Sequence, residues 1–294
     1  MEQAILHAAA AVLFVDGGKI RETRYGHSDA EFDGLEADLY GLRFCHTDKT
    51  AIIGYNVSWD NYYHWFAQCL PAIVHSVRVA SGDRCVLVVR TLRPWQEESL
   101  RILGLADMPR IEANVWKPYF FSKAIYCEYL GGHGGGYISP YLDRVMAALA
   151  RDVAVAEDRP RRLYVSRSDA TRRPLANERA VEAVLRSHGF TVVVPSALSL
   201  VEQIRLFKGA DVVVGPHGAG MTNIGFCRPG TKVLELMQST FVRIFMTRIA
   251  QAARLDYRVE CFASEDREDP LQQNWSVDIG RMMEAVSDMI GATG

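Results

Sequence analysis

The stretch VVVGPHGAGMTN, residues 212–223, places a histidine inside a turn that contains three glycines. A β-branched run that breaks into such a turn is typical of a strand leading into a helix, and the N–H groups at a helix start bind phosphates. His217 adds a ring that donates a hydrogen bond to a phosphate or a sugar hydroxyl, or carries positive charge beside an anion. The glycines match neither the dinucleotide fingerprint nor the P-loop, so a plain turn packed by His217 is the alternative.

A second segment, YVSRSDATRRPLANE at residues 164–178, is rich in arginine. Arg167 follows an apolar run and Arg173 lies in the next loop, and the planar guanidinium fork of arginine binds two phosphate oxygens at once. The alternative is a solvated basic loop, but we expect Arg167 and the turn at 215–220 to lie at the same edge of one sheet. Asn177 either joins this site or caps the helix that follows it.

An acidic residue at the end of a predicted buried strand extends this group. Glu235 alternates with apolar residues in KVLEL, residues 232–236. A buried carboxylate needs a partner or a ligand. The two hydroxyls of a ribose would satisfy it, and an internal salt bridge with an arginine is the alternative.

The segment WDNYYHWFAQCLPAI, residues 59–73, combines aromatic and polar side chains, as carbohydrate and nucleoside pockets do. His64 is the candidate general base, because the ordinary pKa of histidine lies near neutrality. Asp60 is the second candidate, although an aspartate before a helix often caps that helix. The alternative for the aromatic residues is an amphipathic helix with a buried face. His133, in the flexible glycine cluster 131–136, is a further candidate.

The elements that must position these residues are clearest in the C-terminal half. Apolar runs alternate there with segments of helical spacing, which predicts a parallel, doubly wound sheet. Gly189 is expected to end the first helix, and Ser199 with Glu202 forms a capping box before the second. The expected strands are 161–167, 190–195, 211–215 and 231–236, and the expected helices are 177–190, 199–210 and one that begins at 220.

The N-terminal half has a similar but less periodic α/β pattern. Pro71 is expected to kink or divide its first helix. The expected strands are 51–55, 85–89 and 124–130, and the expected helices are 60–80, 95–104 and 141–158. We place a boundary near residue 155, which gives domains 1–155 and 156–294, with the last helix free to pack back on the first domain.

The composition of the 294 residues, 49% hydrophobic and 23% charged, is that of a soluble globular protein long enough for two domains. A formal net charge of −2 lacks the basic excess of a nucleic-acid-binding protein. The six cysteines are scattered without a CxxC pair, which favours free thiols in a reducing cytosol. The apolar run at 4–15 is too short to span a bilayer and lacks the basic lead of a signal peptide, so we expect early core structure.

The sequence predicts no metal site. The eight histidines show neither HxH nor HExxH spacing, and there is no DxD motif of the kind that holds a metal-bound nucleotide sugar. The acidic run EDREDP at 265–270 is expected to be solvated. We therefore expect no cofactor. The free thiols and the N-terminal run predict a cytoplasmic location, and a peripheral contact with the inner face of a membrane is compatible with it.

Four blocks of the sequence together resemble glycosyltransferase family 61. They are NYYHW…LP at 61–71, YVSRSDA…RRPLANE at 164–178, SLVEQIRLFKGADVVVGPHGAGMTN at 199–223 and VLEL at 233–236. The order of the blocks matches over residues 60–240, and the GPHGAGMTN block with the upstream Gln203 is the most specific. The family includes plant xylosyl- and arabinosyltransferases, animal O-linked N-acetylglucosaminyltransferases and bacterial polysaccharide enzymes.

The resemblance implies a GT-B architecture, in which two facing Rossmann-like domains with parallel sheets enclose an active site in the cleft between them. It also implies inversion at the anomeric carbon by single displacement without a metal. The nucleotide sugar would lie on the second domain and the acceptor mainly on the first. By matching motif, the donor diphosphate would be surrounded by Arg167, Arg173, Asn177, His217, Gly218, Ala219, Gly220, Thr222 and Asn223, with Glu235 toward the nucleoside. The acceptor side would be formed by Asn61, Tyr63, Trp65 and Gln68.

One position departs from the family pattern. Members commonly carry an acidic residue four positions after the histidine of the NYxHW block, where this chain has Gln68. An amide cannot take a proton. The base would therefore be His64 or Asp60, the acceptor would need less activation, or the protein would be inactive.

These residues predict an inverting glycosyltransferase that moves a hexosyl or pentosyl group from a nucleotide sugar, by analogy a UDP-sugar, to a glycan or glycoconjugate. The expected setting is bacterial surface polysaccharide synthesis. His64 would deprotonate the acceptor hydroxyl while the diphosphate leaves toward His217. The alternatives are a nucleotide-sugar epimerase on the same fold and a non-catalytic nucleotide-sugar-binding protein. A nicotinamide dehydrogenase is disfavoured because no GxGxxG follows a predicted strand.

Overall fold

A computed structural model of the chain describes residues 1–36, 47, 49–80, 84–131, 139–264 and 274–291. Within it the chain forms two compact units, Met1–Val145 and Met146–Gly294. Some residues named in the sequence analysis lie outside the described residues. They are Cys45, His133, the acidic run at 265–270 and most of the glycine cluster 131–136.

The first unit contains a mixed sheet whose strand order in the described residues is β3-β2-β1-β7-β4-β5-β6. Strands β7, β4, β5 and β6 run parallel to one another, whereas β1 is antiparallel to both β2 and β7. The strands are β1 (Glu2–His7), β2 (Val12–Val15), β3 (Gly18–Lys19), β4 (Thr50–Ile53), β5 (Cys85–Val89), β6 (Arg110–Glu112) and β7 (Pro118–Ile125). The expected parallel pattern is therefore confirmed for one half of this sheet and corrected for the other, because the short connection between β1 and β2 permits only antiparallel pairing. Leu6, Val12 and Leu13 of this hairpin are fully buried, as expected of early core structure.

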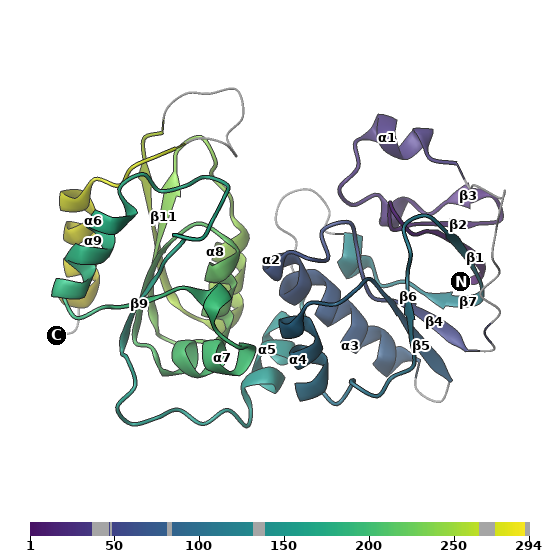
Figure 1. Ribbon diagram of the computed structural model, residues 1–294, viewed down its shortest axis with the longest axis horizontal. Coiled ribbons are helices and arrows are strands. Elements are labelled where there is room, and N and C mark those ends of the chain that lie inside the picture. Colours follow the sequence, from purple (N-terminus) through teal and green to yellow (C-terminus); the bar gives the residue numbers. More distant parts are fainter. Residues whose placement is uncertain (37–46, 48, 81–83, 132–138, 265–273, 292–294) are drawn as a thin grey trace. The chain divides into compact units, whose positions relative to one another are not determined.

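Helices pack beside the parallel half of this sheet (Figure 1). They are α2 (Tyr62–His64), α3 (Leu70–Val79) and α4 (Pro94–Ile102), with α1 (Asp29–Gly34) near the N-terminal hairpin. Helix α5 (Leu142–Ala150) contains the boundary between the two units. A π-helical turn, Trp65–Cys69, joins α2 to α3. The chain stays helical across Pro71, so the expected division is replaced by this π-helical turn just before the proline. Pro71 has no N–H for the carbonyl of Ala67, which instead accepts a hydrogen bond of 3.4 Å from Ser139 N.

The second unit contains a parallel sheet with the strand order β12-β11-β10-β8-β9. Its strands are β8 (Arg162–Val165), β9 (Thr191–Val193), β10 (Val212–Pro216), β11 (Lys232–Gln238) and β12 (Asp256–Phe262). The chain leaves β8 toward β9 and then crosses back to β10 on the other side of β8. In doubly wound sheets ligands bind at the carboxyl ends of the two strands that flank such a reversal, here β8 and β10.

Helices cover both faces of this second sheet (Figure 1). They are α6 (Glu178–Ser187), α7 (Leu200–Gly209), α8 (Phe245–Ala253) and α9 (Ile279–Gly291), with a 3-10 helix, η5 (Ala219–Phe226), after β10. The capping box of Ser199 and Glu202 and the left-handed Gly189 after α6 are confirmed. The helix expected from residue 220 is a 3-10 helix instead, and α8 and β12 were not expected.

The last helix packs on the sheet of its own unit. Met282, Val286 and Met289 of α9 join one buried cluster with Val214 of β10 and Leu234 of β11. Removing such side chains from water stabilises a fold by about 1.5–3 kcal/mol each. This helix is therefore part of the core that supports the edge on which the candidate site lies.

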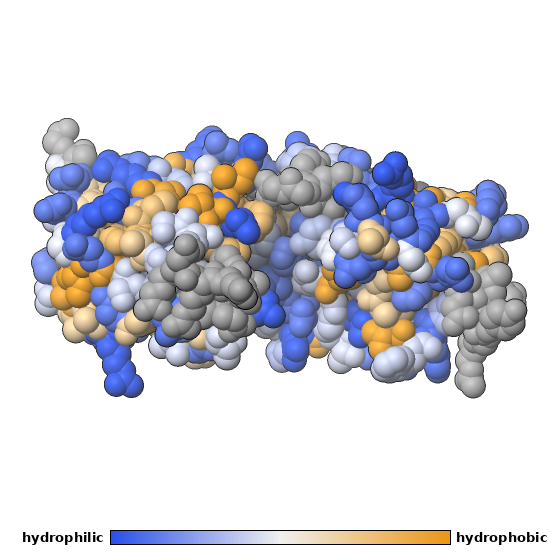
Figure 2. All heavy atoms as spheres, turned by 90° about the horizontal axis from the view of Figure 1, so that it is seen from above, coloured by the Kyte–Doolittle hydropathy of each residue, from blue (hydrophilic) through white to orange (hydrophobic). Residues whose placement is uncertain are grey.

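Polar and apolar residues are interspersed on the face shown in Figure 2. Among the described residues, the large apolar side chains with exposed surface are Met1, Val79, Trp116, Val242, Ile244 and Val259. No described helix combines the length and the apolar character needed to cross a membrane. The described cysteines, Cys69, Cys85, Cys127, Cys227 and Cys261, are free thiols.

Candidate functional site

The glycine-rich turn follows β10 at the carboxyl edge of the second sheet. His217 N donates to Leu236 O at 2.8 Å, which extends the pairing of β10 with β11 by one residue. Beyond this bond the chain departs from the sheet at Gly218 and enters η5. Within the described part of the chain, the N–H groups of Gly218 and Ala219 donate to no backbone carbonyl. The turn therefore presents donors of the kind that bind an anion.

Arg167 lies directly against this turn. Its backbone N–H donates to Glu178 Oε1 at 2.6 Å, and its Nη2 donates to Arg172 O at 2.8 Å, so both ends of the residue are held. A Cβ on Gly218 would lie 1.7 Å from Nη1 of Arg167. Gly218 has an extended backbone with φ 175°, so a side chain at this position would displace the Arg167 guanidinium and would not be opposed by the backbone conformation. The expectation that Arg167 and the turn share one sheet edge is confirmed.

Arg173 brings a second guanidinium to the same edge, and Arg243 brings a third. The two guanidinium carbons lie 4.2 Å and 4.1 Å from the ring centre of Phe241, and the Phe241 ring lies 5.9 Å from that of His217. Burial first, and then the neighbouring charges of Arg167 and Arg243, lower the pKa of Arg173 to about 10. Its buried Nε has no hydrogen-bond partner among the described residues. The fold thus holds three like charges together, which costs free energy unless an anion joins them.

Glu235 pairs with His217, and not with an arginine. Its Oε1 lies 2.7 Å from Nδ1 of His217, and its Oε2 accepts a hydrogen bond from the Tyr257 hydroxyl. Glu235 is completely buried and His217 is 7% exposed. The alternative of an internal salt bridge with an arginine is therefore wrong, and both oxygens that were expected to face a ribose are engaged within the protein.

Tyr257 is the second hydrogen-bond donor to Glu235. Burial, and then the charge of Glu235, raise the pKa of the Tyr257 hydroxyl, so the tyrosine stays a hydrogen-bond donor. A carboxylate that accepts from Tyr257 also accepts from His217, which places a proton on Nδ1 of the histidine. The other ring nitrogen, Nε2, is then the atom of His217 that is left for a ligand.

Two further residues predicted for this site, Asn177 and Asn223, serve the fold. Asn177 donates from Nδ2 to Val277 O at 2.8 Å and accepts from Val277 N at 3.0 Å, so it anchors the C-terminal segment and does not cap α6 with its side chain. Asn223 is fully buried and donates to Gln203 Oε1 at 2.8 Å and to Gly220 O at 3.1 Å. Thr222 is fully buried as well, whereas Ala219 and Gly220 are partly exposed.

In the aromatic segment 59–73 of the first unit, some of the predicted acceptor-side residues belong to the core or cap a helix. Trp65 is fully buried and donates to Ser99 Oγ at 3.0 Å, and Tyr63 is 5% exposed, so the core interpretation holds for both. Asn61 caps α2 by accepting from Tyr63 N at 2.9 Å. The alternative interpretation, that Asp60 caps this helix, is therefore wrong, and Asp60 is exposed.

His64 is half-buried and sits in a polar network that the sequence does not reveal. Its Nδ1 lies 2.9 Å from Gln68 Oε1 and 2.9 Å from the hydroxyl of Tyr25, which lies 39 residues earlier in the chain. Burial lowers the pKa of His64, against smaller opposing effects of Gln68 and Asp60. His64 is therefore neutral near pH 7, as a general base must be. Asn56 joins the network by donating to Gln68 Oε1 at 3.0 Å.

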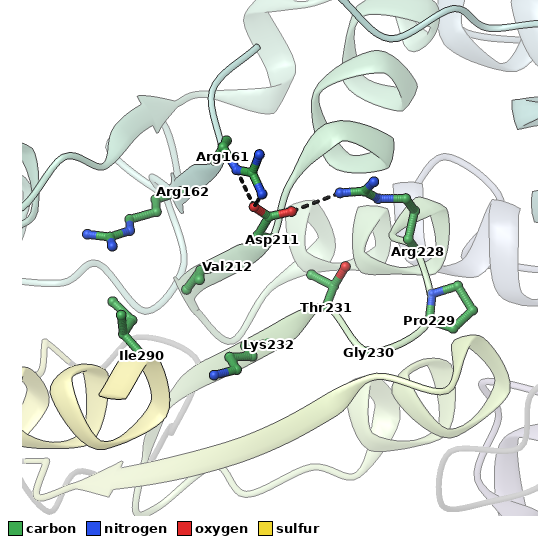
Figure 3. Close-up of a pocket in the computed structure, with 10 residues that line it drawn as sticks. All are labelled: Arg161, Arg162, Asp211, Val212, Arg228, Pro229, Gly230, Thr231, Lys232 and Ile290. Carbon is green, nitrogen blue, oxygen red and sulfur yellow. Dashed lines mark hydrogen bonds and ion pairs between the residues drawn. The ribbon is translucent and has the colours of Figure 1, made fainter. Parts of the chain in front are cut away.

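A cavity of about 560 Å³ lies at the opposite edge of the second sheet, at the amino ends of β8, β10 and β11 (Figure 3). Its cations have partners within the protein. Arg161 and Arg228 flank Asp211, Arg162 donates to His188 O and Lys232 donates to Met289 O. None of the predicted site residues lines this cavity. In the described parts of the chain, no group of three or more His, Cys, Asp or Glu side chains could hold a metal ion.

Comparison with known proteins gives a family and two partial relatives. The family model described as Glycosyltransferase 61 matches residues 62–234. The β-1,2-xylosyltransferase RCN11 of Oryza sativa subsp. japonica is 38% identical over 60 residues, which are 20% of this chain and 11% of the rice protein. A β-1,2-xylosyltransferase of Arabidopsis thaliana is 32% identical over 71 residues, 24% of this chain and 13% of the plant protein. The matched part of this chain thus spans little more than a tenth of the length of either relative.

Proposed function

Because the chain belongs to glycosyltransferase family 61, we propose that it transfers a glycosyl group from a nucleoside-diphosphate sugar to a hydroxyl of a glycan or glycoconjugate. The family match confirms the expected class of enzyme, and it favours transfer over the epimerase alternative. One observation carries the assignment of the donor site. Arg167, Arg173 and Arg243 are held together beside His217 at the edge where a doubly wound sheet binds its ligand.

The diphosphate would add negative charge to a cluster whose positive charge Glu235, Glu178 and Asp169 offset only in part. Arginine forks bind phosphate oxygens through paired, charge-assisted hydrogen bonds, and the N–H groups of Gly218 and Ala219 would add neutral donors. An anion among the arginines would raise the lowered pKa of Arg173 back toward its ordinary value. As the bond to the sugar breaks, negative charge grows on the departing diphosphate, and these groups would stabilise it.

Nε2 of His217 is the predicted contact of this histidine with the diphosphate. Glu235 and Tyr257 hold the ring from the opposite side, so the ring would donate from Nε2 when it carries its second proton. In this proposal the positive groups of the site supply the charge that a metal ion supplies in other transferases. The reaction would then need no cofactor.

His64 is the proposed base toward the acceptor hydroxyl. Direct attack of the activated oxygen would invert the anomeric carbon in one displacement. The finer points of the proposal are a GT-B arrangement, a UDP-linked donor and a place in bacterial surface polysaccharide synthesis on the cytoplasmic side of the membrane. The names of the two plant relatives add a pentose, xylose, as the first sugar to test.

Calorimetry in the presence of EDTA tests the donor site, with UDP, GDP, CDP and CMP as ligands. We expect one diphosphate to bind to the wild type and to lose affinity in His217→Ala and Arg173→Gln. Arg186→Gln is the matched control, because Arg186 lies on the exposed side of α6 and pairs with Glu182. The absence of binding for all four nucleotides would overturn the assignment of the turn. Binding without release of nucleotide from any sugar donor would favour the non-catalytic alternative.

A further inference from the structure

Two buried amides connect His64 to the backbone of the first unit. Asn56 and Gln68 are each 3% exposed, whereas His64 itself is only half-buried. Asn56 Oδ1 accepts from Ser58 N at 3.0 Å, and its Nδ2 donates to Leu130 O at 3.0 Å. A backbone N–H only donates and a backbone carbonyl only accepts, so these two bonds fix which end of the Asn56 amide is oxygen and which is nitrogen.

The orientation of Gln68 follows from that of Asn56. The Asn56 Nδ2 group also lies 3.0 Å from Gln68, and a donor there requires an acceptor opposite it. The atom of Gln68 at this position is therefore Oε1. A reversed Gln68 amide would place two N–H₂ groups against each other in a buried site, where an unsatisfied donor costs about 1–3 kcal/mol.

The protonation of His64 follows in turn. The same Oε1 of Gln68 lies 2.9 Å from Nδ1 of His64, and an acceptor at this distance requires an N–H on the histidine. We infer that Asn56 and Gln68 are positioning residues that hold neutral His64 with its proton on Nδ1, so that Nε2 carries the lone pair that accepts a proton. This inference rests on the proposed function only for the use of that lone pair in sugar transfer.

Tyr25 is the competing influence on the ring. Its hydroxyl lies 2.9 Å from Nδ1 and 3.4 Å from Nε2 of His64. If Tyr25 donated to Nδ1, the proton of the His64 ring would be on Nε2. Nδ1 would then be an acceptor that faces the acceptor Oε1 of Gln68, and this contact is unfavourable. Tyr25 therefore shares the Nδ1 proton as an acceptor, and its hydroxyl is also hydrogen-bonded by Ser58 and Gln68.

Few titratable groups of the described chain lie near His64. They are the carboxylate of Asp60, in the turn before α2, and the neutral hydroxyls of Tyr25 and Tyr63, whose pKa values are raised chiefly by burial. An amide at position 68 therefore leaves the ring neutral, and a carboxylate there would change its charge. Gln68→Glu keeps an acceptor for both Asn56 and His64, but an opposite charge in contact raises the pKa of a histidine by about 1–3 units.

Nitrogen NMR of ¹⁵N-histidine-labelled protein tests the tautomer without any substrate. At mildly alkaline pH we expect the His64 signals, assigned by their loss in His64→Gln, to show a protonated Nδ1 and an unprotonated Nε2. Tyr25→Phe should keep this pattern, and Gln68→Leu should give a mixture of both tautomers. A wild-type ring protonated on Nε2 would overturn the inference, whatever the activity of the protein.

The pH profile of nucleotide release from UDP-sugars tests the use of the lone pair. In Gln68→Glu, the fall of kcat/KM on the acidic side of the profile should shift to higher pH by about one unit or more. The profile of the control Gln251→Glu should not shift, because residue 251 is exposed on α8 in the other unit. A limb that does not move in Gln68→Glu would show that His64 is not the base. Wild-type protein that releases no nucleotide from any donor would defeat the proposed function, and the NMR result would still decide the tautomer.

Discussion

Arg167 occupies the space above Gly218 that a side chain would fill. A Cβ on residue 218 would lie 1.7 Å from Nη1 and 2.8 Å from the central carbon of the guanidinium. The pair joins the loop after β8 to the turn after β10, the two strands that flank the reversal of the sheet. The position of the Arg167 guanidinium therefore depends on the absence of a side chain at residue 218.

Gly218→Ala should weaken nucleoside-diphosphate binding by about tenfold or more, because a charge-assisted hydrogen bond contributes about 1.5–3 kcal/mol. The added methyl displaces the guanidinium of Arg167 from the turn. Calorimetry with the nucleotide that binds the wild type gives the change in affinity. Gly291→Ala is the matched control, since an added Cβ there meets no atom within 4 Å. Unchanged affinity in Gly218→Ala would show that Arg167 does not contact the diphosphate.

The paired arginines on Phe241 should contribute comparably to binding. Arg173→Gln and Arg243→Gln are each expected to lower diphosphate affinity by about tenfold to a hundredfold, and affinity in the wild type should fall with added salt. Calorimetry at two salt concentrations measures both effects. A loss confined to Arg173→Gln would mean that Arg243 only packs on the ring.

Tyr257→Phe should destabilise the protein, because Glu235 is completely buried and loses the donor at Oε2. An unsatisfied buried acceptor costs about 1–3 kcal/mol, and more when it is charged. Urea denaturation gives the free energy of unfolding. Tyr257→Phe combined with Glu235→Gln should recover part of the loss, because the second change removes the buried charge. No recovery in the double variant would contradict the role given to Tyr257.

Asn223→Ala should destabilise the second unit by about 1–3 kcal/mol, since it leaves the buried Oε1 of Gln203 without its donor. The turn should also loosen, because Asn223 holds Gly220 O at 3.1 Å. Denaturation of Asn223→Ala beside Gln203→Ala checks this, and the double variant should cost less than the sum of the two. Additive losses would show that the two residues act separately.

The stability of the first unit should fall as the pH is lowered below 6.5, and His64 should account for part of that fall. The pKa of His64 is below its ordinary value of 6.5 in the folded protein, so between these two values the unfolded chain binds more protons. Stability contributed by a group with a lowered pKa therefore rises with pH across this window. The free energy of unfolding of His64→Gln, measured from acidic to neutral pH, should vary less than that of the wild type.

Local patterns in the sequence were enough to predict many of the elements and part of the donor site. Strand β5 coincides with the expected range 85–89, and the capping box at Ser199 and the stop at Gly189 are where the spacing placed them. Arg167 and the turn at His217 were expected at one edge because the carboxyl ends of neighbouring parallel strands must meet there. Signals of this kind depend on residues within a few positions of one another.

The partners of the two histidines were decided by the tertiary structure alone. Register places Glu235 beside Gly215, and His217, two residues further on, therefore faces the same side of the sheet. Phe241 and Arg243 come from the segment between β11 and α8, and Tyr25 reaches His64 across 39 positions. No periodicity or motif marks such residues, because their roles arise only when strand order and register bring distant parts of the chain into contact. The sequence by itself therefore determined which residue types could do the chemistry, and the fold decided which proton each of them carries and which charge it faces.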